Sequence, residues 1–258
     1  MFESVASLPG DKSALSNTVG DAAGREYWNS IWQKLPPIEL YDGPHYEQHP
    51  VLSQFLSHSG GDAIEIGCGT GSYMIYLNKE FGYRIDGLDY SDNMDYVRAN
   101  LSYNGIHGSE LFAADFFKFV APRKYDLVLS GGFAEHFDNY EEVVRRHAEW
   151  AKPSGLVVII VPNLTHIHKW LCGLFSPEVL RVHRFPLMRR SVMRRSLEKA
   201  GLSVLHCEYH KTFRPTYPLP KALALLFRVF QKILRTLRLD NISNRFGSPY
   251  LISVSRKN

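Results

Sequence analysis

The stretch Asp62-Ala-Ile-Glu-Ile-Gly-Cys-Gly-Thr-Gly71 decides the fold of this chain. Residues 62–66 predict a short buried strand, the glycines at every second position predict a tight turn, and residues 72–81 predict a helix. A strand that turns through glycines into a helix brings bare backbone and a helix N-terminus close to a ligand. Glycine is required there because a Cβ atom would block either the turn or the ligand.

The spacing of these glycines separates the turn from two common nucleotide-binding motifs. G-x-G-x-G differs from the G-x-G-x-x-G of dinucleotide sites, and the G-K-[ST] ending of triphosphate sites is missing. Glu65 precedes the first glycine by two residues, where a carboxylate would repel a pyrophosphate but would suit a ligand with a cationic amino-acid end. The turn resembles motif I of the class I, seven-strand S-adenosylmethionine-dependent methyltransferases. That resemblance implies S-adenosyl-L-methionine as cofactor, bound by Glu65, Gly67, Cys68, Gly69 and Gly71.

The two segments downstream continue the resemblance. Residues 83–88 predict a second strand that ends at Asp89, an acid placed to accept hydrogen bonds from ribose hydroxyls. The next residues resemble the family's D-x-S-x-x-M pattern, in which the methionine either contacts adenine or packs in the core. A third strand over 110–114 leads to an acid for the adenine amino group and an aromatic ring for stacking. The remaining cofactor contacts that the resemblance implies are Tyr90, Met94, Asp115, Phe116 and Ser130.

Strands and helices alternate along the chain at the spacing of a parallel sheet with right-handed crossovers. Further strands are predicted at 125–130, 156–161, 202–209 and 249–256, with a helix at 139–151. We therefore expect an α/β fold, a doubly wound, mostly parallel seven-stranded sheet with helices on both faces. The resemblance implies that the last strand is antiparallel and lies between the fifth and sixth strands.

Three regions are expected around this sheet. Residues 1–24 are small and polar and predict a flexible arm. Residues 25–60 predict a helical cap, with one helix over 25–35 and another that begins at His49 and continues through Leu56. Residues 61–258 are expected to form the methyltransferase domain, which includes a basic helical insertion at 211–245.

The loop after the fourth strand carries the candidate catalytic residues. A bound sulfonium is an activated methyl donor, so the protein must align the acceptor and exclude water. A hydroxyl acceptor also needs a base within hydrogen-bond reach. His136 is the first candidate, with Glu135 beside it, because its ordinary pKa is near neutrality. Alternatively, this pair only shapes the site. Lesser candidates are Asn163, His166 and His168.

The sequence predicts no metal site and no disulfide. His45 and His49 are four residues apart and could face one ion, but no third ligand has suitable spacing. Cys68, Cys172 and Cys207 are odd in number and far apart, which indicates reduced thiols in a cytosolic protein. Cys68 is expected to pack under the glycine turn and not to act as a nucleophile.

Several classes of protein are excluded by missing patterns. No run of about 18 apolar residues predicts a transmembrane helix, and residues 1–16 lack the pattern of a signal peptide. The loop Ser130-Gly-Gly-Phe133 lacks the Asn/Asp-Pro-Pro-aromatic sequence of nucleic-acid amino methyltransferases. No acid ends the fourth strand, which argues against the metal-dependent catechol type. A small molecule, a sugar or a lipid-linked acceptor remains.

The charge is distributed unevenly. Residues 1–163 carry 12 Lys/Arg and 22 Asp/Glu, a net charge of −10, whereas residues 164–258 carry 18 and 4, a net charge of +14. Residues 218–239 predict an amphipathic helix whose cations are Lys221, Arg228, Lys232 and Arg235. Such a helix could lie on an anionic membrane surface or cover the substrate cavity. Nucleic acid is a lesser alternative because no RNA- or DNA-binding module is recognisable.

The expected function is therefore S-adenosylmethionine-dependent O-methyl transfer to a hydroxyl of a small molecule, sugar or lipid-linked acceptor. The expected location is the cytoplasm, with peripheral contact at the inner face of the membrane. Similar enzymes modify quinones, sugars of surface polysaccharides and secondary metabolites. The alternatives are an RNA methyltransferase and a non-catalytic S-adenosylmethionine-binding protein.

Overall fold

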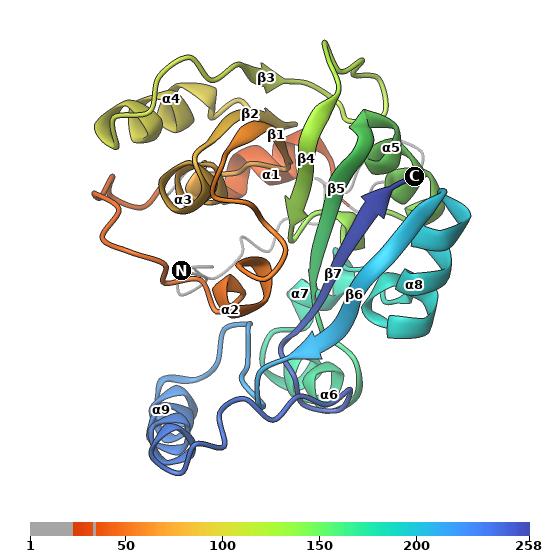
Figure 1. The fold of residues 1–258 in the computed structure, drawn as a ribbon. Helices are drawn as coiled ribbons and strands as arrows, with labels where there is room; N and C mark the ends of the chain where they lie inside the picture. The colour runs from red at the N-terminus through yellow and green to blue at the C-terminus, as the bar shows by residue number, and fades with distance from the viewer. Residues whose placement is uncertain (1–22, 33–34) are drawn as a thin grey trace.

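A seven-stranded sheet in the order β3-β2-β1-β4-β5-β7-β6 forms the centre of the molecule (Figure 1). The computed structural model describes residues 23–32 and 35–258, so nearly all of the predicted arm over 1–24 lies outside the described residues. All seven strands run in one direction except β7, which lies antiparallel between β5 and β6, as the resemblance implied. The strands are β1 (Gly61–Ile66), β2 (Tyr83–Asp89), β3 (Leu111–Ala113), β4 (Tyr125–Gly131), β5 (Ala151–Pro162), β6 (Leu202–His210) and β7 (Tyr250–Lys257).

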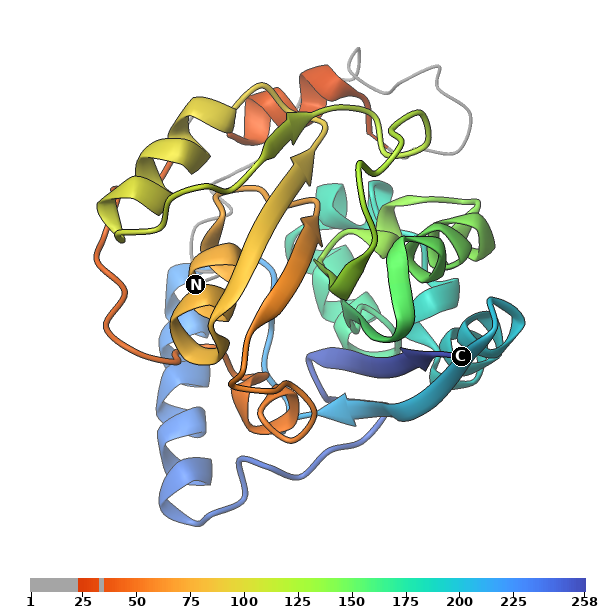
Figure 2. The same ribbon diagram turned by 45° about the horizontal axis from the view of Figure 1, so that its top comes forward.

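Helices cover both faces of this sheet (Figure 2). Alternate residues of β1 point to opposite faces, so that Ile64 and Ile66 join one buried cluster and Ala63 joins the other. The cluster with Ala63 receives apolar side chains from α2 (His49–Leu52), α3 (Ser72–Phe81) and α4 (Met94–Tyr103). The opposite cluster receives them from α5 (Tyr140–Trp150), α6 (His166–Phe175), α7 (Pro177–Arg181) and α8 (Arg190–Lys199), and from the short 3₁₀ helices η2 (Ala134–His136) and η3 (Pro186–Met188). The predicted α/β class is thereby confirmed.

Some boundaries differ from those predicted. The first helix, α1 (Arg25–Ile31), ends before Leu35, and α2 ends at Leu52 although the apolar pattern continues to Leu56. Strand β5 begins at Ala151 and not at the predicted residue 156, because Ala151 and Leu156 both pair with β4 while the residues between them bulge out of register. Ser154 adopts φ +63° in this bulge. Pairing on both sides of an irregularity keeps it inside the strand.

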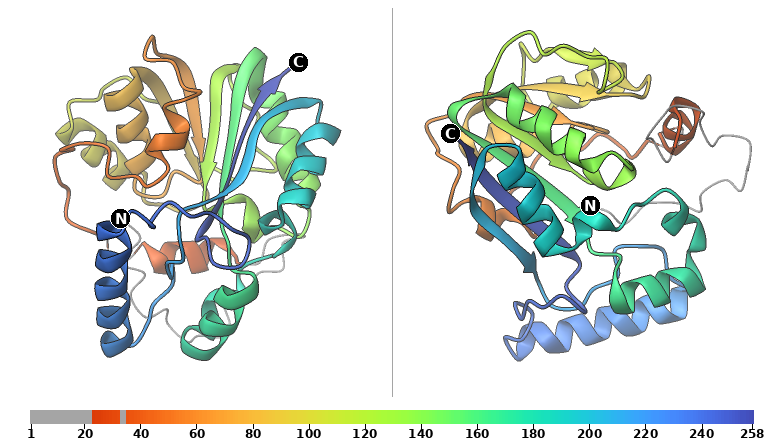
Figure 3. Two further views of the ribbon diagram at one scale, coloured as in Figure 1. Left: turned by 60° about the horizontal axis from the view of Figure 1, so that its bottom comes forward. Right: turned by 90° about the vertical axis from the view of Figure 1, so that its right-hand side faces the viewer.

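The basic insertion leaves and re-enters the sheet at paired positions. His210 at the end of β6 pairs with Tyr250 at the start of β7, and Tyr250 also pairs with Pro162 at the end of β5. The insertion therefore lies at the edge where the parallel strands end, and its helix α9 (Lys221–Thr236) stands apart from the sheet (Figure 3). This helix is shorter than the predicted 218–239. Among the described helices, none is long and apolar enough to cross a membrane.

Candidate functional site

The glycine turn lies between the end of β1 and the start of α3, against the end of β2. The backbone N–H groups of Gly67 and Cys68 both donate to the carbonyl of Leu88, at 2.7 and 3.1 Å. Gly67 and Gly69 have φ of +72° and +52°, in the left-handed region. A Cβ atom on Gly67 would lie 2.6 Å from the ring of Phe133, and one on Gly69 would lie 2.9 Å from the ring of Trp32. Both glycines are thus required by their conformation and by the aromatic rings over the turn.

Glu65 is a buried carboxylate with an unsatisfied oxygen. The residue is 2% exposed, and its Oε2 atom has no hydrogen-bond partner among the described residues. Burial, and secondarily the nearby charge of Asp89, raise the pKa of Glu65 well above its ordinary value. A buried polar atom without a partner costs free energy. A cationic ligand group bound here would relieve that cost, so the position fits the ammonium of a methionyl group.

Asp89 holds the turn in place and faces the ligand site. Its Oδ2 accepts a hydrogen bond from the Gly69 backbone at 2.8 Å, and its Oδ1 accepts from the backbone and hydroxyl of Ser91 at 2.8 and 2.6 Å. A carboxylate can accept about four hydrogen bonds. These protein donors leave Oδ2 with room for a further hydrogen bond, so Asp89 as an acceptor for the ribose hydroxyls stays a prediction.

A cavity of about 370 Å³ opens beside the turn, within the size range of small-molecule sites. Several residues expected from the sequence line it together: Gly67, Asp89, Tyr90, Asp115, Phe116 and His136. Asp115 is itself fixed, because its Oδ1 accepts from the Phe117 backbone at 2.8 Å. Aromatic rings from distant parts of the chain form most of the remaining wall: Trp28, Trp32, Phe117, Phe133 and Phe137. The acidic residues and the aromatic walls suit a ligand with a ribose, an adenine and a cationic end.

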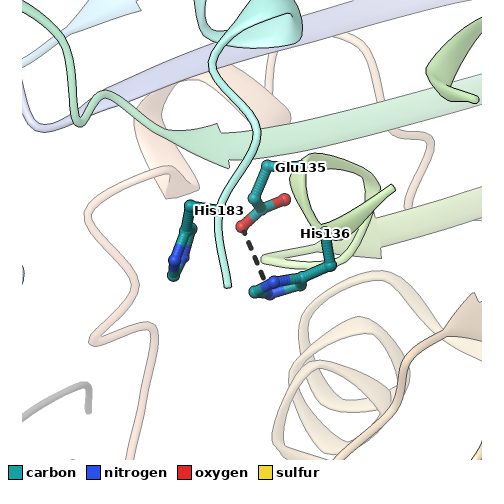
Figure 4. A group of neighbouring side chains, drawn as sticks. All are labelled: Glu135, His136 and His183. Atoms are coloured by element: carbon teal, nitrogen blue, oxygen red, sulfur yellow. Dashed lines mark ion pairs between the residues drawn. The ribbon is translucent and has the colours of Figure 1, made fainter. Parts of the chain in front are cut away.

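Glu135, His136 and His183 form a cluster beside this cavity (Figure 4). The Nδ1–H of His136 donates to the carbonyl of Val182 at 2.6 Å, which leaves a lone pair on Nε2, and that atom lies 3.9 Å from Oε1 of Glu135. Burial lowers the pKa of His136 to about 4 and raises the pKa of Glu135 to about 8. His136 is therefore neutral at pH 7 and has a lone pair on Nε2 that can bind a cation. A pKa this far below neutrality makes it a weaker base than its residue type suggested.

Other residues expected at the cofactor do not line the cavity. The buried Ser130 hydroxyl is hydrogen-bonded to Nε2 of His147 at 2.9 Å, and Met94 packs in the core between α3 and α4. Cys68 is buried under the turn, as expected, and burial raises the pKa of its thiol well above the ordinary value. Gly71 shapes the start of α3, where a Cβ atom would lie 2.9 Å from Val97. Ser130 and Met94 thus make contacts within the protein core, whereas Cys68 and Gly71 support the glycine turn.

The lesser catalytic candidates contact the end of the insertion and do not line the cavity. The amide of Asn163 donates to the carbonyls of Arg245 and Ser248, at 3.1 and 2.8 Å, and so fastens the end of the insertion. His168 is fully buried and its ring is hydrogen-bonded to the carbonyl of Gly247 at 2.8 Å. His166 is exposed at the start of α6 and packs against the ring of Phe246. None of these three residues lines the cavity described above.

Neither His183 nor the part of the cavity wall formed by Trp28 and Trp32 could be predicted from the sequence. His183 follows α7 and comes close to His136 only in the folded chain, with ring centroids 4.6 Å apart. Helix α1 supplies Trp28, whose ring packs edge-on against His136 at 4.8 Å. An ion pair between Arg25 and Asp92 ties α1 to the loop after β2. The helical spacing of the aromatic residues in 25–35 predicted a cap, but it could not predict which residues the cap contacts.

A family model described as a methyltransferase domain matches residues 46–207, more than half of the chain. The ubiquinone biosynthesis O-methyltransferase of Rickettsia bellii is 24% identical over 160 residues, which are 60% of this chain and 64% of that protein. The (S)-coclaurine N-methyltransferase of Thalictrum flavum subsp. glaucum is 24% identical over 102 residues, 39% of this chain and 28% of that protein. The chain thus spans less than two thirds of the length of these curated relatives.

The fold is similar to that of solved methyltransferases. The crystal structure of an S-adenosylmethionine-dependent methyltransferase from Mesorhizobium loti superposes with a TM-score of 0.56 at 16% identity, over 83% of this chain and 99% of that one. At this identity the likeness concerns the fold alone. Since both O- and N-methyltransferases occur among the similar sequences, the comparisons do not distinguish the atom that is methylated.

Proposed function

This chain belongs to the class I S-adenosylmethionine-dependent methyltransferases, and we propose that it transfers the methyl group to a hydroxyl of a small, glycan or lipid-linked acceptor. The observation that carries the proposal is the arrangement of one cavity. Asp89, Asp115 and His136 line this cavity together, and His136 keeps a lone pair on Nε2. We assign the two carboxylates to the cofactor and His136 to the acceptor.

We assign separate roles in the reaction to the residues of the cavity and to Glu65, which is buried in β1 just before the glycine turn. Glu65 would hold the cationic end of the cofactor, and Asp89 and Asp115 would hold the ribose and adenine. The aromatic walls exclude water and favour an acceptor with an apolar or aromatic body. A hydroxyl loses its proton during methyl transfer, so a proton acceptor near the methyl group favours an oxygen acceptor over an amine that is already neutral. His136, with Glu135 behind it, occupies that position in the proposal.

The proposal is tested with S-adenosylmethionine that carries a labelled methyl group. The purified protein is incubated with phenols, with lipid-linked sugars and with neutral amines of comparable size, and labelled products are identified by mass spectrometry. We expect label on oxygen, with one molecule of S-adenosylhomocysteine formed per methyl group transferred. Transfer to amines alone would contradict the proposed acceptor class, and no transfer to any acceptor would favour a binding protein without catalysis.

We further propose that α9 brings the protein to an anionic membrane surface, where a lipid-linked acceptor would lie. None of its residues is buried, and one side of it exposes a row of apolar side chains, among them Leu226, Phe230 and Ile233, which are 63%, 41% and 51% exposed. Leu223, Phe227 and Leu234 face the protein instead and are only half-buried. Cations flank the exposed row, a pattern typical of interfacial helices.

Replacing Phe230 with Glu should weaken binding to vesicles of phosphatidylcholine and phosphatidylglycerol by about tenfold, because the substitution removes a large apolar group from the interface. The measurement is flotation of the protein with vesicles at low and high salt, and the wild type should release as salt increases. Val120→Glu is the matched control, since Val120 is 85% exposed on the loop between β3 and β4, outside α9. If the wild type does not float with these vesicles at low salt, the membrane proposal is wrong.

A further inference from the structure

Three potential metal ligands converge at the edge of the cavity. Glu135 and His136 come from η2 after β4, and His183 comes from the segment after α7 (Figure 4). One ligand atom from each lies within 4.8 Å of the other two. Glu135 is 1% exposed and His136 is 6% exposed, so the cluster is largely removed from bulk water. His183 joins Glu135 and His136 only in the folded chain, so the spacing of residues in the sequence could not predict this group of three.

The two histidines are oriented as metal ligands are. The Nδ1–H of His136 donates to the carbonyl of Val182, and the Nδ1–H of His183 donates to the carbonyl of Val179, each at 2.6 Å. A carbonyl can only accept, so both rings carry their proton on Nδ1 and keep a lone pair on Nε2. Backbone carbonyls that fix the tautomer and the ring orientation in this way are the usual outer partners of metal-bound histidines.

The carboxylate of the cluster lacks a matching donor. Oε2 of Glu135 is buried and has no hydrogen-bond partner within the described parts of the chain. Arg184 donates its backbone N–H to the Glu135 carbonyl, but its guanidinium is turned to Asp138, with Nε 2.6 Å from that carboxylate. A buried carboxylate oxygen without a protein partner is satisfied when it binds a cation. Two imidazole lone pairs and one carboxylate are donors that suit a transition-metal ion.

We propose that Glu135, His136 and His183 bind one divalent transition-metal ion whose open coordination position faces the cavity. Two imidazoles and one carboxylate suit Zn²⁺, Fe²⁺, Mn²⁺ or Co²⁺ better than Mg²⁺ or Ca²⁺, which prefer oxygen ligands alone. Three protein ligands and an open fourth position are typical of catalytic zinc sites. At bond lengths of about 2.1 Å, tetrahedral ligands lie roughly 3.4 Å apart, so binding would draw the side chains together by about an ångström.

The ion would have a role in the proposed reaction, and only this role rests on the proposed function. The ion would displace the proton of Glu135 and bind its carboxylate. Two positive charges on the ion and one negative charge on Glu135 would then leave a net charge of +1, which favours the deprotonated form of a hydroxyl at the open position. The hydroxyl proton would pass to solvent, its oxygen would bond to the methyl carbon, and the carbon–sulfur bond electrons would remain on sulfur. His136 would then act as a ligand and not as the base.

The test measures metal binding without requiring methyl transfer. Protein stripped of metal with a chelator is titrated with Co²⁺ and Zn²⁺, followed by cobalt absorption and calorimetry, and we expect one ion per chain. Loss of an outer partner alone costs about 10–100-fold in metal affinity, so His183→Gln and Glu135→Gln should each weaken binding by more than roughly 100-fold. The control is His45→Ala, which removes an exposed histidine paired with Asp42 and should leave the affinity unchanged.

Binding of S-adenosylhomocysteine, measured in parallel, shows that the cavity of each variant is intact. No saturable uptake by the wild type overturns the metal site, and so does wild-type affinity in His183→Gln or Glu135→Gln with the cavity intact. An enzyme that binds one ion through these residues but transfers no methyl group would retain the metal site and refute the proposed function. Methyl transfer by a protein that takes up no metal would refute the metal site and retain the proposed function.

Discussion

Asp89→Ala should weaken the binding of S-adenosylmethionine and S-adenosylhomocysteine by roughly 100-fold or more. The substitution removes the proposed acceptor for a ribose hydroxyl. It also leaves the Gly69 N–H without the partner that holds it at 2.8 Å, so the glycine turn loses the contact that fixes its backbone. Two losses of about 1–3 kcal/mol each account for an effect of this size. The measurement is a calorimetric titration of each ligand into the purified variant.

The matched control for this prediction is Asp95→Ala. Asp95 is also a carboxylate near the cofactor side of the sheet, but it is fully exposed in the first turn of α4, where it pairs with Arg98. Surface pairs of this kind contribute little, so Asp95→Ala should bind both ligands like the wild type. Equal affinity in Asp89→Ala and the wild type would remove Asp89 from the cofactor site.

His136→Ala should lower turnover by roughly 100-fold or more with little change in the affinity for S-adenosylhomocysteine. Both roles considered for His136, as proton acceptor and as metal ligand, need the lone pair on Nε2, and alanine supplies none. The residue lines the cavity, and its ring packs on Trp28 and not on the residues that hold the glycine turn. The measurement combines methyl-transfer kinetics with a calorimetric titration of S-adenosylhomocysteine.

Added imidazole separates loss of the lone pair from general damage to the site. A small imidazole that enters the space left by the deleted ring should restore part of the turnover of His136→Ala. His45→Ala, which removes an exposed ring far from η2 in the sequence, should keep full activity. Unchanged turnover in His136→Ala would exclude the residue from the reaction and leave it a purely structural role.

The parts of the fold that depend on local patterns could be predicted from the sequence. The buried run 125–130 and the glycine turn at 67–71 each determine their own conformation, because backbone sterics and burial on both faces act over a few residues. The order of strands followed from the family resemblance. The ends of elements were less certain, as β5 shows, because its pairing with β4 on both sides of the bulge extends the strand back to Ala151.

The site could be predicted only where its residues share one segment. Glu65, Gly67 and Asp89 belong to a single strand–turn–helix–strand unit, so their spacing carried the information. His183 is brought to Glu135 by the packing of α7 and the segment after it, which no periodicity in either segment records. The partner of Ser130 could not be predicted for the same reason, because only the fold brings His147, on the neighbouring helix α5, to its hydroxyl.

The paired positions of His210 and Tyr250 have a consequence for the evolution of this enzyme. The chain between them leaves and returns at adjacent points of the sheet, so its length and composition can change without altering the pairing of β6 with β7. Longer excursions of this kind cost little additional chain entropy. Natural selection can therefore replace the module that carries α9 and keep the cofactor machinery of β1 and β2 intact. Acceptor choice and location in the cell could diverge among descendants of one ancestor whose chemistry stays the same.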